Sequence, residues 1–247
     1  MLAGIREILI ITTPADSESF KTLLGDGSKL GVNFEYVVQP SPAGIAEAFV
    51  LGEDFISNES VALILGDNLF HGSGLAQNLE AAICNAGATI FTYDVSNPSD
   101  YGVIELDQFG KPLSIEEKPQ SPKSNHAITG LYIFPPGVSD RAKKLSPSKR
   151  GEIEITDLIK SYLASPDILN VERFSRGLAW LDTGSAKSLH DASTFVRVVE
   201  ERTGAKIGCL EEVSWRKGWI SDEDLKRLAS AYPANEYGNY LRELASH

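Results

Sequence analysis

Short apolar runs alternate with helix-like patterns along most of the chain. Continuous apolar segments predict buried strands at residues 8–11, 34–38, 61–65 and 88–93. Apolar residues at helical spacing predict helices over residues 45–50, 75–83 and 155–163. This alternation is typical of an α/β fold rather than an all-β fold. Residues 61–65 are apolar on both faces, so we expect a central parallel strand there.

The second half of the chain carries a hairpin signal and then turns helical. Residues 101–106 and 113–116 flank the turn sequence Asp107–Gly110. Further strands are expected at residues 128–134, 171–174 and 178–181. A helical stripe over residues 189–199 should stop near Gly204, and Ser221 with Asp224 resembles a capping box. We expect an α/β core over residues 1–204 and a helical lobe over residues 205–247.

Composition narrows the class of protein. The 247 residues are 42% hydrophobic and 23% charged, with a net charge of −11. The apolar content favours a folded protein, and the negative charge argues against a general partner of nucleic acid or anionic membranes. No apolar stretch approaches the roughly 20 residues of a membrane span, and no signal peptide is visible, so we expect a cytoplasmic protein. Cys84 and Cys209 are expected to be reduced thiols, and the four histidines lack the spacing of a zinc site.

Two aspartates follow predicted strands. Asp67 comes directly after residues 61–65, and Asp182 comes directly after residues 178–181. In open α/β sheets, ligands bind beyond the carboxyl ends of the strands. Carboxylates there suit Mg²⁺, which takes oxygen ligands and often shares them with substrate phosphates. Alternatively, each aspartate is a turn residue that caps the next element.

Two further segments carry groups that could bind a nucleotide sugar. Gln39 could hydrogen-bond a nucleobase edge, and Gly44 would allow a ligand close to the backbone; the alternative is a rigid proline turn. Glu117 and Lys118 could bind sugar hydroxyls and a phosphate, although a solvated charge run is the usual meaning of such a sequence. The acidic segment 151–157 is explained by the dipole of the helix that it begins.

These weak signals gain weight because they occur together in one order. The motifs are Gln39-Pro-Ser-Pro, Leu65-Gly-Asp-Asn, Tyr101-Gly-Val, Glu116-Glu-Lys-Pro, Gly130-Leu-Tyr, Gly151-Glu-Ile-Glu-Ile-Thr-Asp and Trp180-Leu-Asp-Thr-Gly. This set resembles the sugar-phosphate nucleotidylyltransferases, and among them the glucose-1-phosphate thymidylyltransferases. The resemblance runs from residue 1 to the C-terminus and implies a Rossmann-like nucleotidyltransferase sheet with a small helical C-terminal extension.

The resemblance implies a reaction and a role for each residue. A phosphate oxygen of glucose 1-phosphate would attack the α-phosphorus of dTTP, giving dTDP-glucose and pyrophosphate. Asp67 and Asp182 would hold Mg²⁺, and Lys118 would contact the sugar phosphate. Gln39 and Gly44 would bind the base. The residues expected at the glucose are Tyr101, Gly102, Glu117, Ile128 and Tyr132, with Trp180 as a further substrate contact. The family also implies a homotetramer and, often, inhibition by a downstream dTDP-sugar.

The chain departs from the family pattern at its start. The family begins with a strand, a Gly-Gly-x-Gly-Thr-Arg loop and a helix, and this sequence has no such segment. We therefore expect an N-terminally truncated chain with two strand edges left without partners. One alternative is a non-catalytic sugar-nucleotide-binding subunit or inactive fragment of the same fold. Another is a metal-dependent glycosyltransferase, although Asp67 is followed by Asn68 and Leu69 rather than by an Asp-x-Asp pattern. The choice between dTTP and UTP stays open, since one methyl group discriminates weakly.

Overall fold

The structure is a computed structural model, which describes residues 1–165 and 168–246. The chain divides into two compact units, Gln39–Thr183 and Met1–Val38 with Gly184–His247. The first unit contains every residue that the sequence nominates for the site. The boundaries of these two units differ from the domain boundary expected at residue 205, which stays a prediction.

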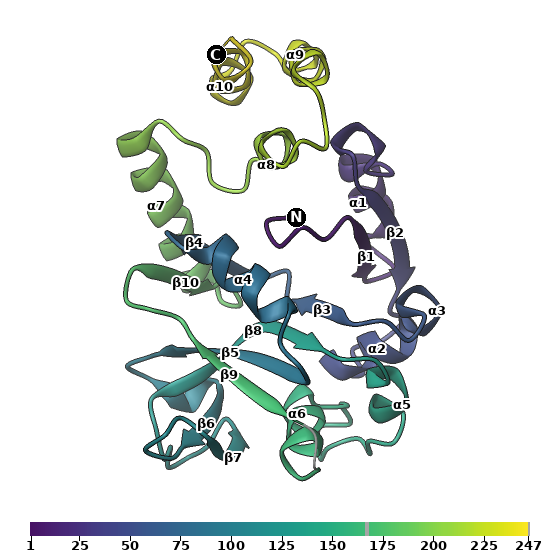
Figure 1. Ribbon diagram of the computed structural model, residues 1–247, viewed down its shortest axis with the longest axis vertical. Helices are drawn as coiled ribbons and strands as arrows, with labels where there is room; N and C mark the ends of the chain where they lie inside the picture. The colour runs from purple at the N-terminus through teal and green to yellow at the C-terminus, as the bar shows by residue number, and fades with distance from the viewer. Residues whose placement is uncertain (166–167, 247) are drawn as a thin grey trace. The chain divides into compact units, whose positions relative to one another are not determined.

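A six-stranded mixed sheet forms the centre of the unit Gln39–Thr183 (Figure 1). Its middle strand, β8 (His126–Phe134), is buried along almost its whole length. One edge of β8 pairs with β5, and the other pairs with β6 and β3, all antiparallel. The remaining strands extend the sheet as β6–β7 and, in parallel, β5–β9. The bounds are β3 (Val61–Ile64), β5 (Ala88–Asp94), β6 (Gly102–Leu106), β7 (Pro112–Glu117) and β9 (Leu169–Arg173).

Side chains that alternate along these strands bury the two faces of the sheet in separate clusters. On β8, Tyr132 and Phe134 belong to one cluster, while Leu131 and Ile133 belong to the other. The first cluster packs against α2 (Ala48–Leu51), α5 (Val138–Ala142) and α6 (Ile155–Leu163), where the Phe49 and Phe134 ring centroids lie 5.1 Å apart. The second packs against α4 (Leu75–Ile83). Helices on both faces explain why these strands are apolar throughout, and they confirm the predicted α/β fold.

The prediction for residues 61–65 is wrong in its direction. β3 runs antiparallel to β8, and it pairs with no second strand among the described residues. Ile64 is accordingly 58% exposed. An apolar run reports the burial of a strand but carries no information on the direction of its neighbour, so the sequence could not settle this point.

A separate two-stranded sheet carries the backbone around Asp67 and Asp182. β4 (Asn68–Gly72) pairs antiparallel with β10 (Leu178–Asp182). β10 confirms the strand predicted at residues 178–181, whereas β4 was not predicted. Gly72 is required here because a Cβ on it would lie 2.6 Å from the backbone oxygen of Gly177.

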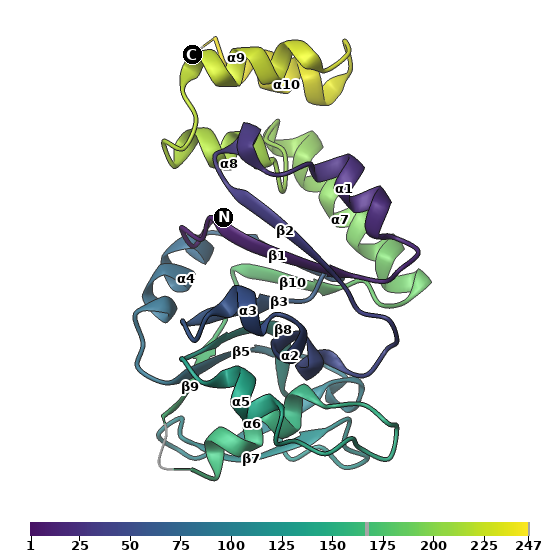
Figure 2. The same ribbon diagram turned by 90° about the vertical axis from the view of Figure 1, so that its right-hand side faces the viewer.

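The other unit combines a parallel pair of strands with helices. β1 (Glu7–Thr12) and β2 (Asn33–Val38) pair in register, and α1 (Ser17–Leu24) connects them. α7 (Ala186–Thr203) ends at Gly204, which has a φ of 72°, as the sequence predicts. The other helices are α8 (Leu210–Arg216), α9 (Asp222–Ala231) and α10 (Glu236–Leu244), and Figure 2 shows the last two side by side. The chain is completed by the one-turn helix α3 (Glu53–Ile56) and by short 3₁₀ turns at Ser28–Leu30, Ile45–Glu47 and Pro98–Asp100.

The C-terminal helices surround a small core of their own. Ile220, Leu225 and Leu241 are buried together. The predicted capping box is confirmed, since Ser221 and Asp224 each bond the other's backbone N–H at 3.1 Å. The described residues include no helix that is long and apolar enough to cross a membrane.

Candidate active site

The structure brings Asp67 and Asp182 to adjoining positions, although they are far apart in the sequence. A turn joins β3 to β4, closed by a hydrogen bond from the Asn68 N–H to the Leu65 carbonyl at 3.1 Å, and Asp67 lies within it. Asp182 is the last residue of β10 and is paired with Asn68. Both the backbone N–H and the hydroxyl of Thr183 donate to the Asp67 carbonyl, at 2.8 and 2.9 Å. The two backbones that carry the carboxylates are therefore fastened together.

Aromatic rings line the approach to Asp182. The rings of Tyr101 and Trp180 lie 5.1 Å apart, and the ring of Tyr93 lies 5.9 Å from Trp180 on another side. Burial raises the pKa of the Tyr101 hydroxyl, and the negative charge of Asp182 raises it further. The contact with Trp180 places Tyr101 beside β10, and the raised pKa keeps its phenol protonated as a hydrogen-bond donor.

A second group of predicted residues meets around Gly102, the first residue of β6. A Cβ built on Gly102 would lie 3.1 Å from Cγ2 of Thr156, 3.3 Å from Oε2 of Glu117 and 3.8 Å from Cδ1 of Ile128. These three side chains come from α6, β7 and β8. The absence of a side chain at Gly102 therefore leaves the Glu117 carboxylate accessible from the β6 backbone.

Glu117 and Tyr132 connect this group with Asp67. Burial raises the pKa of the Glu117 carboxyl, and the nearby negative charge of Glu154 raises it further, while Lys118 and Arg150 oppose the shift. Tyr132 is only 4% exposed. Burial raises the pKa of its phenol, and the charges of Glu117 and Asp67 add to that shift. Tyr132 is therefore a neutral phenol whose pKa responds to the charges of both carboxylates.

Lys118 has an unusual backbone. Its φ is 44°, a left-handed conformation that residues with a side chain adopt at a cost. Its N–H donates to the Tyr101 carbonyl at 3.0 Å, which ties the end of β7 to the residue before β6. The lysine side chain is exposed. Strained residues of this kind concentrate at functional sites, where the surrounding contacts hold them in place.

Gln39 and Gly44 form a braced loop that leads into α2. The Gln39 Nε2 donates to Glu47 Oε2 at 2.6 Å and approaches the Gly44 carbonyl at 3.4 Å. Gly44 has a φ of 106°, and a Cβ on it would lie 2.4 Å from the Ile153 carbonyl oxygen. Backbone hydrogen bonds from Ile153 to Ala43 and from Ala46 to Ile153 hold the two segments together. The loop is thus fixed against the segment that precedes α6.

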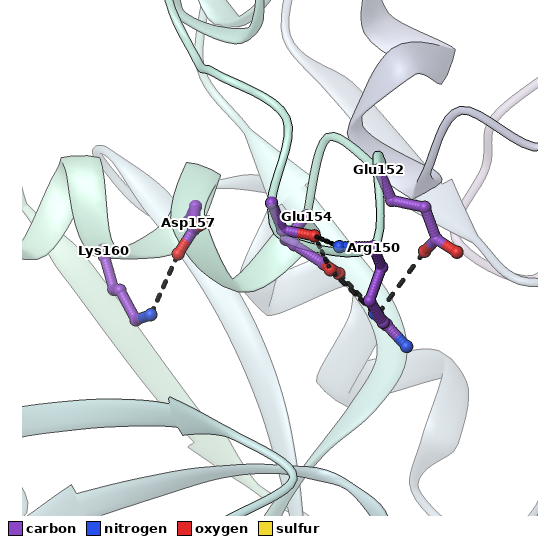
Figure 3. Close-up of polar contacts among 6 residues, drawn as sticks. Arg150, Glu152, Glu154, Asp157 and Lys160 are labelled. Atoms are coloured by element: carbon purple, nitrogen blue, oxygen red, sulfur yellow. Dashed lines mark hydrogen bonds and ion pairs between the residues drawn. The ribbon is translucent and has the colours of Figure 1, made fainter.

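The segment before α6 contains charged residues for which the sequence suggests only an interaction with the helix dipole. α6 begins at Ile155, so Glu152 and Glu154 precede its first turn. Figure 3 shows them with Arg150, whose guanidinium bonds Glu154 at 2.8 Å and lies 3.4 Å from Glu152. Among the acidic residues of segment 151–157, Asp157 alone lies inside α6, where it pairs with Lys160 at 2.9 Å. Two consecutive basic residues, Lys149 and Arg150, just before alternating glutamates are the signal that could have identified this ion pair.

The oxygen donors of the site suit a hard cation that also has other ligands. The described residues contain no cluster of three or more histidine, cysteine or acidic side chains able to hold a metal ion. Asp67 and Asp182 would supply two carboxylates, and the remaining positions around an ion would fall to substrate and water. This donor set fits Mg²⁺, which often binds through one or two carboxylates together with phosphates. A cavity of about 490 Å³ elsewhere in the unit, between Gly87 and Arg141, includes none of the predicted site residues.

Comparison with known proteins gives a consistent family assignment. The sequence profile of the nucleotidyl transferase family matches residues 1–198. The glucose-1-phosphate thymidylyltransferase of Neisseria meningitidis is 52% identical over 99% of this chain and 85% of its own length. The Mycobacterium tuberculosis enzyme of the same name is 51% identical over 99% of this chain and 84% of its own. A structure of UDP-glucose pyrophosphorylase complexed with UDP-glucose superimposes with a TM-score of 0.67 at 26% identity, covering 79% of this chain and 82% of that one. Together with the fold and the paired aspartates, these matches show that the chain belongs to the nucleotidyl transferase family.

Proposed function

We propose that this chain transfers a thymidylyl group from dTTP to glucose 1-phosphate, giving dTDP-glucose and pyrophosphate. The names of relatives about half identical to this chain over nearly its full length support the substrates. The observation that carries the proposal is the junction of β4 and β10, which places Asp67 and Asp182 at adjoining positions. The charge of Asp182 raises the pKa of Tyr101, and the charges of Glu117 and Asp67 raise the pKa of Tyr132.

The reaction exchanges one phosphorus–oxygen bond for another. A phosphate oxygen of glucose 1-phosphate bonds to the α-phosphorus of dTTP, and the bond from that phosphorus to the bridging oxygen breaks to release pyrophosphate. The chain needs no side-chain nucleophile, because alignment of the two substrates and stabilisation of charge lower the barrier. Mg²⁺ bound by Asp67 and Asp182 would neutralise part of the phosphate charge.

Each remaining residue contributes to binding or orientation. The Glu117 carboxylate accepts hydrogen bonds from glucose hydroxyls, and Gly102 and Ile128 provide the surface on which the ring lies. Tyr101, Trp180 and Tyr132 bound the same region. Gln39 bonds the edge of the thymine, and the backbone at Gly44 approaches it closely.

Charge is the main difficulty that the protein must overcome. The chain has a net charge of −11, so its overall field repels both substrates. Local cations must compensate for this field. Lys118 lies at the end of β7 with its side chain exposed, and Arg150 is 50% exposed beside Glu154. Lys118 contacts the phosphate of glucose 1-phosphate in this proposal, whereas the charge of Arg150 is already paired with Glu154 and Glu152.

Pyrophosphate release tests the proposal. The purified chain should release pyrophosphate when it receives dTTP, glucose 1-phosphate and Mg²⁺ together, and not when any one is omitted. Asp67→Asn should reduce the rate at least 100-fold. Asp191→Asn serves as the matched control, because it breaks an exposed ion pair with Lys187 on α7 and leaves the site intact. A wild-type chain that is folded yet releases no pyrophosphate would contradict the proposal. A homotetramer stays a prediction from the resemblance, and a cytoplasmic location stays a prediction from the sequence.

A further inference from the structure

The side chain of Asn68 joins three strands beside the two aspartates. Its Oδ1 accepts a hydrogen bond from the Gly130 N–H on β8 at 3.0 Å and another from the Trp180 Nε1–H on β10 at 2.6 Å. Its Nδ2 donates to Oδ1 of Asp67 at 2.8 Å. Asn68 is also the backbone partner of Asp182. The Asn68 side chain thus bonds the Asp67 carboxylate directly and also bonds Trp180 on β10, the strand that carries Asp182.

The surrounding groups fix which way this amide points. A backbone N–H and an indole N–H can only donate, so the atom that faces Gly130 and Trp180 must be the amide oxygen. The amide nitrogen then faces Asp67, whose ionised carboxylate can only accept. A flipped amide would oppose donors with donors on one side and oxygen with oxygen on the other. Two rigid donors therefore determine the direction of the hydrogen bond that Asp67 receives.

Gly130 allows this arrangement because it has no side chain. A Cβ built there would lie 2.7 Å from both Cγ and Oδ1 of Asn68, closer than non-bonded carbon and oxygen atoms approach. Gly130 is buried in the middle of β8, so its backbone cannot move aside. Its N–H also lies directly against Asn68, where it anchors the amide to the most buried strand of the sheet.

We propose that Asn68 is a positioning residue that holds the Asp67 carboxylate in the orientation that receives the divalent ion. This inference rests on the proposed function and identifies the group that sets the geometry of its cation site. Asp67 is exposed and lies in a turn, so without a partner its carboxylate would rotate among several rotamers. The hydrogen bond from Asn68 orders it before the ion arrives. Loss of such an outer partner typically weakens metal binding by about 10- to 100-fold.

Binding of Mn²⁺ alone provides the test, because it does not depend on turnover. The electron paramagnetic resonance signal of free Mn²⁺ would be titrated with the full chain and three variants. Asn68→Ala should raise the Kd for Mn²⁺ about 10-fold. Trp180→Phe keeps the amide and an aromatic ring but removes one of the two orienting donors, so it should raise the Kd by a smaller factor, about 3-fold.

Asn170→Ala is the matched control for the loss of an asparagine that bonds backbone. Its Nδ2 donates to the Ala86 carbonyl at 2.7 Å, in the same unit but away from the aspartates. Asn68→Ala and Asn170→Ala should both lower the melting temperature, but only Asn68→Ala should weaken Mn²⁺ binding. Unchanged Mn²⁺ affinity in a folded Asn68→Ala chain, or in Trp180→Phe if Asn68→Ala fails to fold, would overturn the inference.

Kinetics separate this inference from the proposed function. In Asn68→Ala, the Mg²⁺ concentration for half-maximal rate should rise with the Mn²⁺ Kd, while the KM for glucose 1-phosphate stays within about twofold. A rise in that KM without a change in metal dependence would overturn the positioning role. A wild-type chain that binds Mn²⁺ but forms no product would contradict the proposed function and leave the Asn68 comparison valid. A wild-type chain that binds no Mn²⁺ would overturn both.

Discussion

Replacing Gly102 with alanine adds one methyl group at the centre of the proposed glucose site. Gly102 does not have a positive φ, so alanine fits its backbone without strain. The new methyl would meet Thr156 Cγ2 at 3.1 Å and Glu117 Oε2 at 3.3 Å, so these neighbours must shift by a few tenths of an ångström. Crowding of this kind costs about 1–3 kcal/mol, and the reduced freedom of the unfolded chain offsets about 0.4–1 kcal/mol of it. The net loss of stability should be about 1 kcal/mol.

The effect on glucose binding should exceed this loss of stability. The methyl occupies the space through which the sugar reaches Glu117, and it displaces the carboxylate that the hydroxyls need. A misfit of one methyl group at a specific site costs about 1–3 kcal/mol, or roughly 10- to 100-fold in kcat/KM. The loss should appear in the KM for glucose 1-phosphate, because Gln39 and Gly44, which are proposed to bind the base, lie in a separate loop.

Steady-state kinetics with each substrate varied in turn measure this selectivity. Gly102→Ala should raise the KM for glucose 1-phosphate at least 10-fold and change the KM for dTTP by less than twofold. Gly177→Ala is the matched control, since a Cβ there would meet only Ser175 Oγ at 3.8 Å. Equal increases in both KM values, or none in either, would refute the assignment of Gly102 to the sugar.

Three further substitutions test other parts of the site. Glu117→Gln should raise the melting temperature at pH 8 but not at about pH 4. Burial and the charge of Glu154 raise the pKa of this carboxyl in the folded state, so the stability of the wild-type chain falls as the pH rises through that pKa. The neutral amide of glutamine does not ionise and therefore avoids this loss of stability. If thermal melts at the two pH values show equal shifts, the buried-carboxylate argument is wrong. Lys118→Gly should stabilise the chain by about 1 kcal/mol in urea denaturation by relieving its positive φ, yet lower activity at least 10-fold through loss of the cation; a destabilised variant would count against backbone strain. Gly44→Ala should lower the free energy of unfolding by about 3 kcal/mol and raise the KM for dTTP, because its methyl would meet the Ile153 backbone at 2.4 Å and the positive φ adds strain. A variant as stable as wild type would show that the loop is not rigid.

The strands and helices that bury apolar side chains were predictable from the sequence, because burial itself creates the pattern. β8 and α6 lie where their periodicity places them. β4 was missed because its five residues, Asn68–Gly72, are too short and too mixed in polarity to show a period. The antiparallel direction of β3 was missed because pairing depends on β8, about seventy residues further along the chain.

The residues of the candidate site were predictable one by one, but their arrangement in space was not. Each aspartate could be identified as a residue that follows a strand, but only the ladder between β4 and β10 brings the two together. The positive φ of Lys118 leaves no mark in a sequence of Glu-Glu-Lys-Pro. Arg150 was overlooked because charges near a helix start are usually explained by the helix itself. Tertiary contacts decide these features, and local composition does not report them.

Tracing the α-phosphate of dTTP tests the central claim most directly. With dTTP labelled at the α-phosphorus, glucose 1-phosphate and Mg²⁺, the account predicts that the label appears in dTDP-glucose, that unlabelled pyrophosphate is released in equal amount, and that transfer is lost in both Asp67→Asn and Asp182→Asn. Label that remains in dTTP with the folded wild-type chain, or full transfer in either variant, would contradict the account.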